Sequence, residues 1–330
     1  MIAGARRSVP GLLLLVAVAG AATLLGRAIP LVTPLVLAIA VGAVAANVFR
    51  IPAWAERGVA THSTLLEAGI ILLGASLSVE AIVAAGPVLV GLIVAVVAFG
   101  LALVQALSRA AALGDRMGSL LAAGSSICGV SAIAAVAPVC DADESQIAHA
   151  AATILLFDAV TLVAFPAVGS LLDVAPRPFG VWIGLSMFST GPVAAAGFAH
   201  SPVAGKWATM TKLARNALIG VVAVGYSIRY TGRTAGAIDQ PVRQVWVDFP
   251  KFLLGFVLVA LLTNVGAIPG WAVDPILTAS DALFLLAFAG LGFEIRLGEL
   301  RNAGVVPVGV VGGYLLVVSA LTYLLVGALF

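Results

Sequence analysis

The chain has 330 residues, of which 62% are hydrophobic and 10% are charged, and its mean hydropathy is +1.16. Because a soluble domain carries roughly 25% charged residues, this composition excludes an ordinary soluble protein and indicates an integral membrane protein. The formal net charge of +2 is spread along the chain without a basic run, so nucleic acid is not supported as a partner. The sequence contains no motif for zinc hydrolysis, nucleotide phosphates, serine hydrolysis or Asp-rich magnesium binding, so we expect neither an enzyme nor a cofactor.

The first segment has Arg6 and Arg7 ahead of the run GLLLLVAVAGAA, a pattern shared by signal peptides and membrane helices. We interpret it as a membrane helix, because ten more apolar segments follow and a retained first span suits such a chain. Windows of about 20 apolar residues, the length that crosses a bilayer as a helix, predict eleven spans. They lie near residues 11–28, 30–49, 64–84, 86–107, 118–140, 145–172, 179–199, 205–228, 250–268, 276–295 and 304–330.

The distribution of positive charge gives an orientation for these spans. If every span crosses, thirteen of the 17 Lys and Arg residues lie on the side of the N-terminus, two lie on the other side, and two lie within a span. Cytoplasmic loops carry the excess of Lys and Arg, so we expect the N-terminus inside, the C-terminus outside, and a location in the inner (plasma) membrane. The polar stretch from Thr231 to Asp248 is predicted to be an interfacial connection.

The segment 118–140 is apolar enough to span a bilayer, but small and polar residues interrupt its middle. They are Ser125, Ser126, Cys128, Gly129 and Ser131. Unwound backbone at membrane depth persists only where protein or water satisfies its polar groups, so broken membrane helices commonly mark substrate sites. A half-helix that begins near Gly129 would direct its free N–H groups and positive dipole end at an anion. The alternative is a tight helix crossing, in which Ser and Gly only let neighbours approach.

A second interruption lies in the segment 179–199, where Gly191 and Pro192 follow Ser189 and Thr190. Pro192 suits the first position of a new half-helix, which would place the hydroxyl and N–H groups of Ser189, Thr190 and Gly191 at its N-terminus. Two broken helices in one chain favour a binding site near the middle of the membrane.

Lys212 and Arg215 are three residues apart within the span 205–228, so they share one helix face. A charge near the bilayer centre costs at least roughly 2.5–3.5 kcal/mol on insertion scales, which indicates a wet or charge-compensated environment. Either these cations form an anion pocket, or they pair with Asp158 or extend to the lipid headgroups.

Asp158 lies deep within a predicted span, and two roles are open for it. It either relays a proton or binds a coupling cation, or it is the counter-charge for Lys212 or Arg215. The acidic loop of Asp141, Asp143 and Glu144 is expected to cap the helix that follows it.

Two internal likenesses suggest an inverted repeat, a common construction of transporters. Residues 72–90 resemble 286–308, and these segments run in opposite directions in the predicted topology. Residues 129–135, GVSAIAA, resemble 191–197, GPVAAAG, but both would run the same way if every span crosses. That second likeness therefore reflects composition alone, or one segment is a re-entrant hairpin. We expect one transporter domain over 1–330, with N-terminal helices in 1–63, a first half in 64–172 and a second half in 179–330.

Three motifs resemble the bacterial YeiH-like family, to which sulfate export is assigned. They are GSSICGVSAIAAVAPV at 124–139, FGVWIGLS at 179–186 and ATMTKLARN at 208–216, and the resemblance extends roughly from Leu65 to the C-terminus. It implies a polytopic inner-membrane protein of ten or eleven helices that is related to the broken-helix secondary transporters. The chain departs from the family where relatives have a histidine, an acid and a glutamine, because Phe188, Ser189 and Pro192 stand there. If those groups couple protons or recognise the substrate in relatives, this chain either differs in substrate or couples in another way.

We predict an all-α secondary transporter that moves a small anion, such as sulfate or a related oxyanion or sulfonate, across the inner membrane. An anion channel, or a membrane-embedded enzyme or sensor, is the alternative. The predicted partners are the anion and the lipid bilayer. The exact substrate, the direction, the coupling ion and the oligomeric state, a homodimer among the options, are left open. The substrate-binding residues would be Ser125, Ser126, Cys128, Gly129, Ser131, Ser189, Thr190, Gly191, Lys212 and Arg215, with Asp158 as a coupling group or counter-charge.

Overall fold

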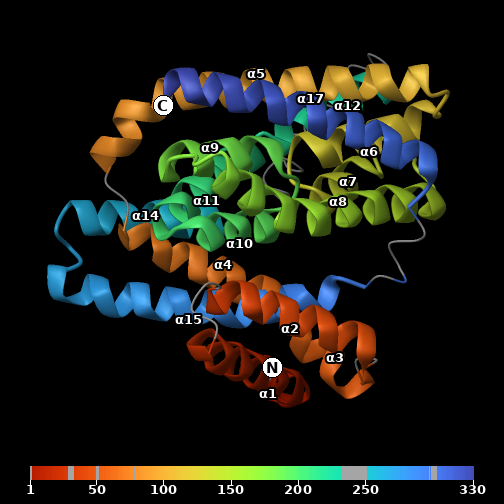
Figure 1. Ribbon diagram of the computed structural model, residues 1–330. Helices are drawn as coiled ribbons and strands as arrows, with labels where there is room; N and C mark the ends of the chain where they lie inside the picture. The colour runs from red at the N-terminus through yellow and green to blue at the C-terminus, as the bar shows by residue number, and fades with distance from the viewer. Residues whose placement is uncertain are drawn as a thin grey trace. The chain divides into compact units, whose positions relative to one another are not determined.

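The computed structural model describes residues 2–28, 33–49, 52–76, 79–231, 251–296, 298 and 303–330. Every regular element in this described part is a helix, which confirms the all-α prediction (Figure 1). The connection expected at Thr231–Asp248 lies outside the described residues apart from Thr231, the last residue of a helix. Among the described residues, six candidate spans are long and apolar enough to cross a membrane: Ser8–Ala28, Trp54–Ser76, Gly86–Ala110, Glu144–Leu171, Gly270–Glu294 and Val305–Leu329.

The chain forms two compact units, which we describe separately. Unit 1 comprises Met1–Gly86 and Lys251–Leu297, and unit 2 comprises Pro87–Pro250 and Gly298–Phe330. The helices of unit 1 are α1 (Ile2–Ala28), α2 (Pro34–Val48), α3 (Ala53–Val59), α4 (His62–Leu73), α14 (Phe252–Asn264) and α15 (Gly270–Glu294).

Small residues bring the backbones of unit 1 together. Gly42 of α2 lies so close to α15 that a Cβ atom at position 42 would be 2.4 Å from the carbonyl oxygen of Ala289. On the other side of α15, Ser280 donates a hydrogen bond to the carbonyl of Gly69 in α4. Close backbone approach through Gly and Ser is typical of helix packing in membranes, where apolar burial gives little drive for association.

Unit 2 holds both interrupted segments. Its helices are α5 (Val79–Ala110, which starts in unit 1), α6 (Asp115–Ser126), α7 (Val130–Val136), α8 (Glu144–Leu171), α9 (Pro176–Ser186), α10 (Thr190–His200), α11 (Pro202–Asn216), α12 (Ile219–Thr231) and α17 (Val305–Leu329). The acidic loop before α8 caps that helix as predicted. The carboxylate of Asp143 accepts from the N–H of Gln146 at 2.8 Å, and the side chain of Gln146 accepts from the N–H of Asp143 at 3.2 Å.

The segment α6–α7 is a re-entrant hairpin, which we call hairpin 1. Arg116, at the start of α6, forms an ion pair of 2.9 Å with Asp141, which follows α7. A straight helix would separate these residues by roughly 38 Å. Near the other end of the hairpin, Ile133 of α7 packs against Gly124 of α6. The chain therefore enters along α6, turns at residues 127–129 and returns along α7.

The segment α9–α10 is a second re-entrant hairpin, hairpin 2. His200, the last residue of α10, hydrogen bonds with the carbonyl of Val174 at 3.0 Å, and its ring stacks on Phe179 of α9 at 4.1 Å. Both halves pack against α11, but in opposite directions. Gly180 and Gly197 contact the first half of α11, whereas Met187 and Thr190 lie at its last turn. The chain therefore turns at residues 187–189, which settles the open choice for this segment in favour of a hairpin.

The hairpins enter unit 2 from opposite ends. The 28-residue helix α8, roughly 42 Å long, begins at the base of hairpin 1 and ends beside Phe179 at the base of hairpin 2 (Figure 1). The eleven-span prediction therefore needs a correction, because 118–140 and 179–199 each return to the end of unit 2 where they start. Hydropathy cannot distinguish the two cases, since an apolar segment has the same composition whether it crosses or returns.

The sequence predicts one span over 205–228, but the structure divides this segment between α11 and α12. The helix is interrupted at Ala217 and Leu218, where the N–H of Leu218 donates to the carbonyl of Arg215 rather than to the residue four positions before it. This irregularity lies one residue after Asn216, at the same level as the hairpin tips.

The hairpins can be tested by labelling. In a cysteine-free variant, single cysteines at the exposed positions Arg116 and Asp141 should react with an impermeant maleimide from the same side of the membrane. Cysteines at the exposed positions Ala175 and Val203 should react only from the opposite side, because α8 separates the two bases. Labelling of inside-out and right-side-out vesicles measures this. Reaction of 116 and 141 from opposite sides would mean that this segment crosses.

Candidate functional site at the hairpin tips

The two tips meet at Gly129 and Ser189. A Cβ atom at position 129 would lie 2.1 Å from the hydroxyl oxygen of Ser189. The φ of Gly129 is +69°, a backbone conformation that residues other than glycine rarely adopt. Gly129 is the residue before α7, so this half-helix begins where the sequence predicted. Helix α10 begins at Thr190, so Pro192 is its third residue. The prediction that Pro192 is the first residue of this half-helix is therefore wrong.

Arg215 holds the first halves of both hairpins together. Its guanidinium is fully buried and donates to carbonyls in the last turn of α6, from Nε to Ser126 at 2.7 Å and from Nη2 to Ser125 at 2.5 Å. Nη1 donates to Leu185 at 2.7 Å and to Met187 at 2.8 Å, at the end of α9. A cation at a helix C-terminus compensates carbonyls that have no partner within the helix. Arg215 does this for two helices at once.

Lys212 repeats this arrangement one turn earlier on α11. Its ammonium, also fully buried, donates to the carbonyl of Ile127 at 2.6 Å and to that of Met187 at 3.2 Å. These carbonyls belong to the two tips, so Lys212 bridges the hairpins as Arg215 does. Full burial rules out the alternative in which these side chains extend to the headgroups.

The acid at this site lies at the beginning of α10. Asp158 of α8 is 4% exposed, and its carboxylate accepts from the N–H of Ser189 at 3.0 Å. It also interacts electrostatically with Lys212 and Arg215. A carboxylate at a helix N-terminus is favourable because the partial charge there is positive. These contacts fit the interpretation of Asp158 as a counter-charge.

The structure brings together nearly all of the predicted residues but gives some of them different contacts. The carbonyls of Ser125 and Ser126 accept hydrogen bonds from Arg215. Cys128, in the turn of hairpin 1, is 8% exposed and lies close enough to Lys212 for an electrostatic interaction. Ser131 is exposed on α7 and makes none of these tip contacts. Ser189 and Thr190 are half-buried, while Gly191 is buried.

Two participants were missed in the sequence. Asn216 donates to the hydroxyl of Thr190 at 2.9 Å, and the hydroxyl of Tyr314 in α17 donates to the carbonyl of Ser125 at 2.9 Å. Asn216 could have been found, because it shares a helix face with Lys212, four positions earlier. Tyr314 carries no comparable signal in a continuous apolar helix.

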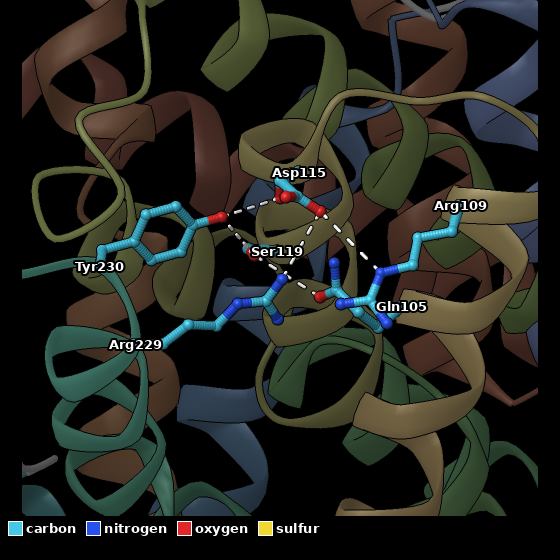
Figure 2. Close-up of polar contacts among 6 residues, drawn as sticks. All are labelled: Gln105, Arg109, Asp115, Ser119, Arg229 and Tyr230. Atoms are coloured by element: carbon cyan, nitrogen blue, oxygen red, sulfur yellow. Dashed lines mark hydrogen bonds and ion pairs between the residues drawn. The ribbon is translucent and has the colours of Figure 1, made fainter. Parts of the chain in front are cut away.

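A separate polar cluster fixes the base of hairpin 1 to its neighbours (Figure 2). The carboxylate of Asp115 pairs with Arg229 of α12 at 3.5 Å and with Arg109 of α5 at 4.0 Å. Beside these pairs, Tyr230 donates to the carbonyl of Asp115 at 3.0 Å and shares a part-buried hydrogen bond of 2.9 Å with Ser119. Exposed ion pairs contribute at most about 1 kcal/mol each, so this cluster orients the base rather than stabilising the whole unit.

Fold and site together define a class, the helical membrane proteins in which re-entrant hairpins meet at buried charges. The sequence matches the family model described as Conserved hypothetical protein 698 over residues 10–311, and the chain belongs to this family. This confirms the YeiH-like resemblance.

The chain is also similar to several proteins named as UPF0324 membrane proteins. The one from Bradyrhizobium diazoefficiens is 34% identical over 308 residues, covering 90% of this chain and 86% of the relative. The one from Nitratidesulfovibrio vulgaris is 31% identical over 312 residues with the same coverage, and one from Streptococcus agalactiae is 29% identical, covering 91% of both chains. No solved structure matches this chain.

Removal of Arg215 should be strongly destabilising. Arg215→Ala would leave buried carbonyls of two helix ends without donors, and breaking a buried charge network typically costs about 3–5 kcal/mol of unfolding free energy. Chemical denaturation in detergent measures this. Arg109→Ala is the matched control, because its side chain is 62% exposed and its loss should cost less than about 1 kcal/mol. Similar losses in the two variants would show that the guanidinium does not hold the tips.

Gly129→Ala should loosen the contact between the tips. The φ of +69° alone costs roughly 1–2 kcal/mol for a residue with a Cβ atom, and the overlap with Ser189 adds to that cost. The double variant Gly129→Ala/Ser189→Gly removes the overlap and should recover part of the stability. Gly91→Ala is the control, because nothing lies within 4 Å of its Cβ position. Equal unfolding midpoints for the two alanine variants would contradict the geometry.

Proposed function

We propose that this chain is a secondary transporter of a small anion and that the anion binds where the two hairpin tips meet. Unwound backbone and ionisable side chains inside a membrane protein are costly, and in transporters they mark the substrate site. Both features occur here at one place, in a member of a family whose relatives are named only as membrane proteins.

The excess of buried positive charge carries this proposal. In the described part of unit 2, the buried charged side chains are Lys212, Arg215 and Asp158, two cations and one acid. The helix ends at the tips add little net charge, because two C-termini and two N-termini contribute opposite partial charges of about 0.5 each. One positive charge is therefore left over, and an uncompensated buried charge is costly. A bound anion would offset it.

The burial of each side chain determines whether it can contact the anion. Lys212 and Arg215 are fully buried behind the helix C-termini, so they attract the anion through their field rather than by contact. Ser189 and Thr190 are half-buried at the start of α10, where their hydroxyl groups and the positive end of the helix dipole suit an oxyanion such as sulfate or a sulfonate. Asp158 then limits how strongly the anion is held, which suits a site that must also release it.

The hairpins also support a revised membrane topology for this transporter. With nine crossings and two hairpins, and the N-terminus inside, twelve of the 17 Lys and Arg residues lie inside and three outside. This asymmetry favours the inner membrane with the C-terminus outside. In this topology α7 and α10 run in opposite directions, as an inverted repeat requires.

Asp158→Asn tests the charge argument, because it removes the negative charge while its Oδ1 can still accept from Ser189. A nearby carboxylate opposes a bound anion, so without it the anion should bind at least about tenfold more tightly, which corresponds to about 1.4 kcal/mol. Binding is measured by thermal stabilisation with sulfate, thiosulfate, sulfite and small sulfonates. Asp173→Asn, an exposed acid near the base of hairpin 2, is the control. Weaker binding in Asp158→Asn would contradict the positive excess.

Transport itself is measured with the purified protein in liposomes. Uptake of the labelled anion that binds best should saturate and should be stimulated by unlabelled anion inside, as exchange through a carrier requires. Flux that neither saturates nor shows stimulation indicates an anion channel. If none of these anions binds or crosses, the proposal is wrong.

A further inference from the structure

Six backbone carbonyls converge at the hairpin tips, three from each hairpin. The last helical hydrogen bonds run from Ile127 to Ala123 in α6 and from Met187 to Ile183 in α9. Carbonyls beyond these acceptors have no partner within their helix. The hydrogen bonds of Lys212 and Arg215 go to the carbonyls of Ser125, Ser126, Ile127, Gly184, Leu185 and Met187.

Such a set of oxygens is a ligand set for a monovalent cation. Membrane proteins bind alkali ions with backbone carbonyls alone, and the unwound carbonyls and C-terminal ends of broken helices hold the coupling cation in transporters. Each helix C-terminus carries a negative partial charge of about 0.5, so two facing C-termini favour a cation between them. Without a cation, the two ends would repel each other in a buried place.

We propose that the carbonyls of Ile127 and Met187 form a monovalent-cation site that the chain fills with its own Lys212. Its ammonium contacts one carbonyl from each tip, at 2.6 and 3.2 Å, and it is fully buried. Arg215 occupies the adjoining carbonyls of the same two helix ends. The covalently attached ammonium takes the place of an alkali ion here and joins the two tips.

This inference extends the proposed function, because it specifies the co-ion requirement of the same site. If the cation is covalently attached, anion transport needs neither Na⁺ nor K⁺. If Lys212 is shortened, the vacated oxygens should accept a small free cation in its place. The second consequence does not depend on anion transport and can be tested without it.

The decisive experiment uses Lys212→Ala in the full-length protein. Thermal unfolding is followed in detergent at constant ionic strength, with methylammonium, Na⁺ or K⁺ replacing tetramethylammonium, which is too large for the site. We expect methylammonium to raise the midpoint of Lys212→Ala by about 3 °C or more at tenfold its Kd, and to leave the wild type unchanged. Lys206→Ala is the control, because it removes a lysine near the start of the same helix.

A second pair of variants makes the test specific. Guanidinium at low millimolar concentration should stabilise Arg215→Ala but not Lys212→Ala. Its planar shape fits the larger space left by the arginine side chain but not the smaller space left by the lysine. If Lys212→Ala is too unstable to purify, it should be recovered when methylammonium is present throughout expression and purification. Lys212→Met keeps the length of the side chain and should respond to no cation. The proposal is overturned if methylammonium, Na⁺ and K⁺ all fail to stabilise or recover Lys212→Ala.

The co-ion consequence is measured on the wild type in liposomes. Anion uptake should be the same when Na⁺ and K⁺ are replaced by N-methylglucamine, and a stimulation of more than about twofold by either ion would overturn the inference. Absence of uptake under all conditions would instead contradict the proposed function. The thermal measurements would then still decide whether Lys212 fills a cation site.

Discussion

The structure of unit 2 depends on the contact between two side-chain cations and two helix C-termini. A helix that ends inside a membrane leaves its last carbonyls without partners, and water is not available to satisfy them. Hairpins 1 and 2 both end a helix in this way, at Ser126 and Ser186. Lys212 and Arg215 satisfy both ends at once, so each of these two side chains joins the two hairpins. This explains why α11 packs against both halves of hairpin 2 and contacts the tip of hairpin 1.

The same contact fixes the arrangement of the second half-helices. Once the C-termini of α6 and α9 face one another, the chain must reverse within three residues in each hairpin, and Gly129 supplies the backbone conformation needed for the first reversal. The starts of α7 and α10 are thereby placed together, with the carboxylate of Asp158 at the N–H of Ser189. Opposite charges are thus sorted by helix end, with cations at the C-termini and the acid at an N-terminus.

The sequence was sufficient to locate the interruptions and the charged residues but not to give their partners. Ser125–Gly129 and Ser189–Pro192 stand out because Ser, Gly and Pro break an apolar pattern, and Lys212 and Arg215 stand out because a span seldom carries charge. The hydrogen-bond acceptors of Lys212 and Arg215 are backbone carbonyls. Every residue has one, so the amino-acid sequence does not indicate which carbonyls these two side chains bond. The reversal of each hairpin was hidden for a similar reason, since it shows only in contacts such as that between Arg116 and Asp141, which a straight helix would keep apart.

The internal likeness between 129–135 and 191–197 gains meaning from this correction. Under eleven crossings the two segments run the same way, which an inverted repeat forbids. With both segments in hairpins that enter from opposite ends of unit 2, α7 and α10 run away from the shared tips in opposite directions. The observation that removes two crossings therefore also removes the objection to a repeat. If only one of the two segments reversed, its helix C-terminus would not face a second one. Because both segments reverse, the C-terminus of α6 lies opposite the C-terminus of α9, and Lys212 and Arg215 can bond the carbonyls of both.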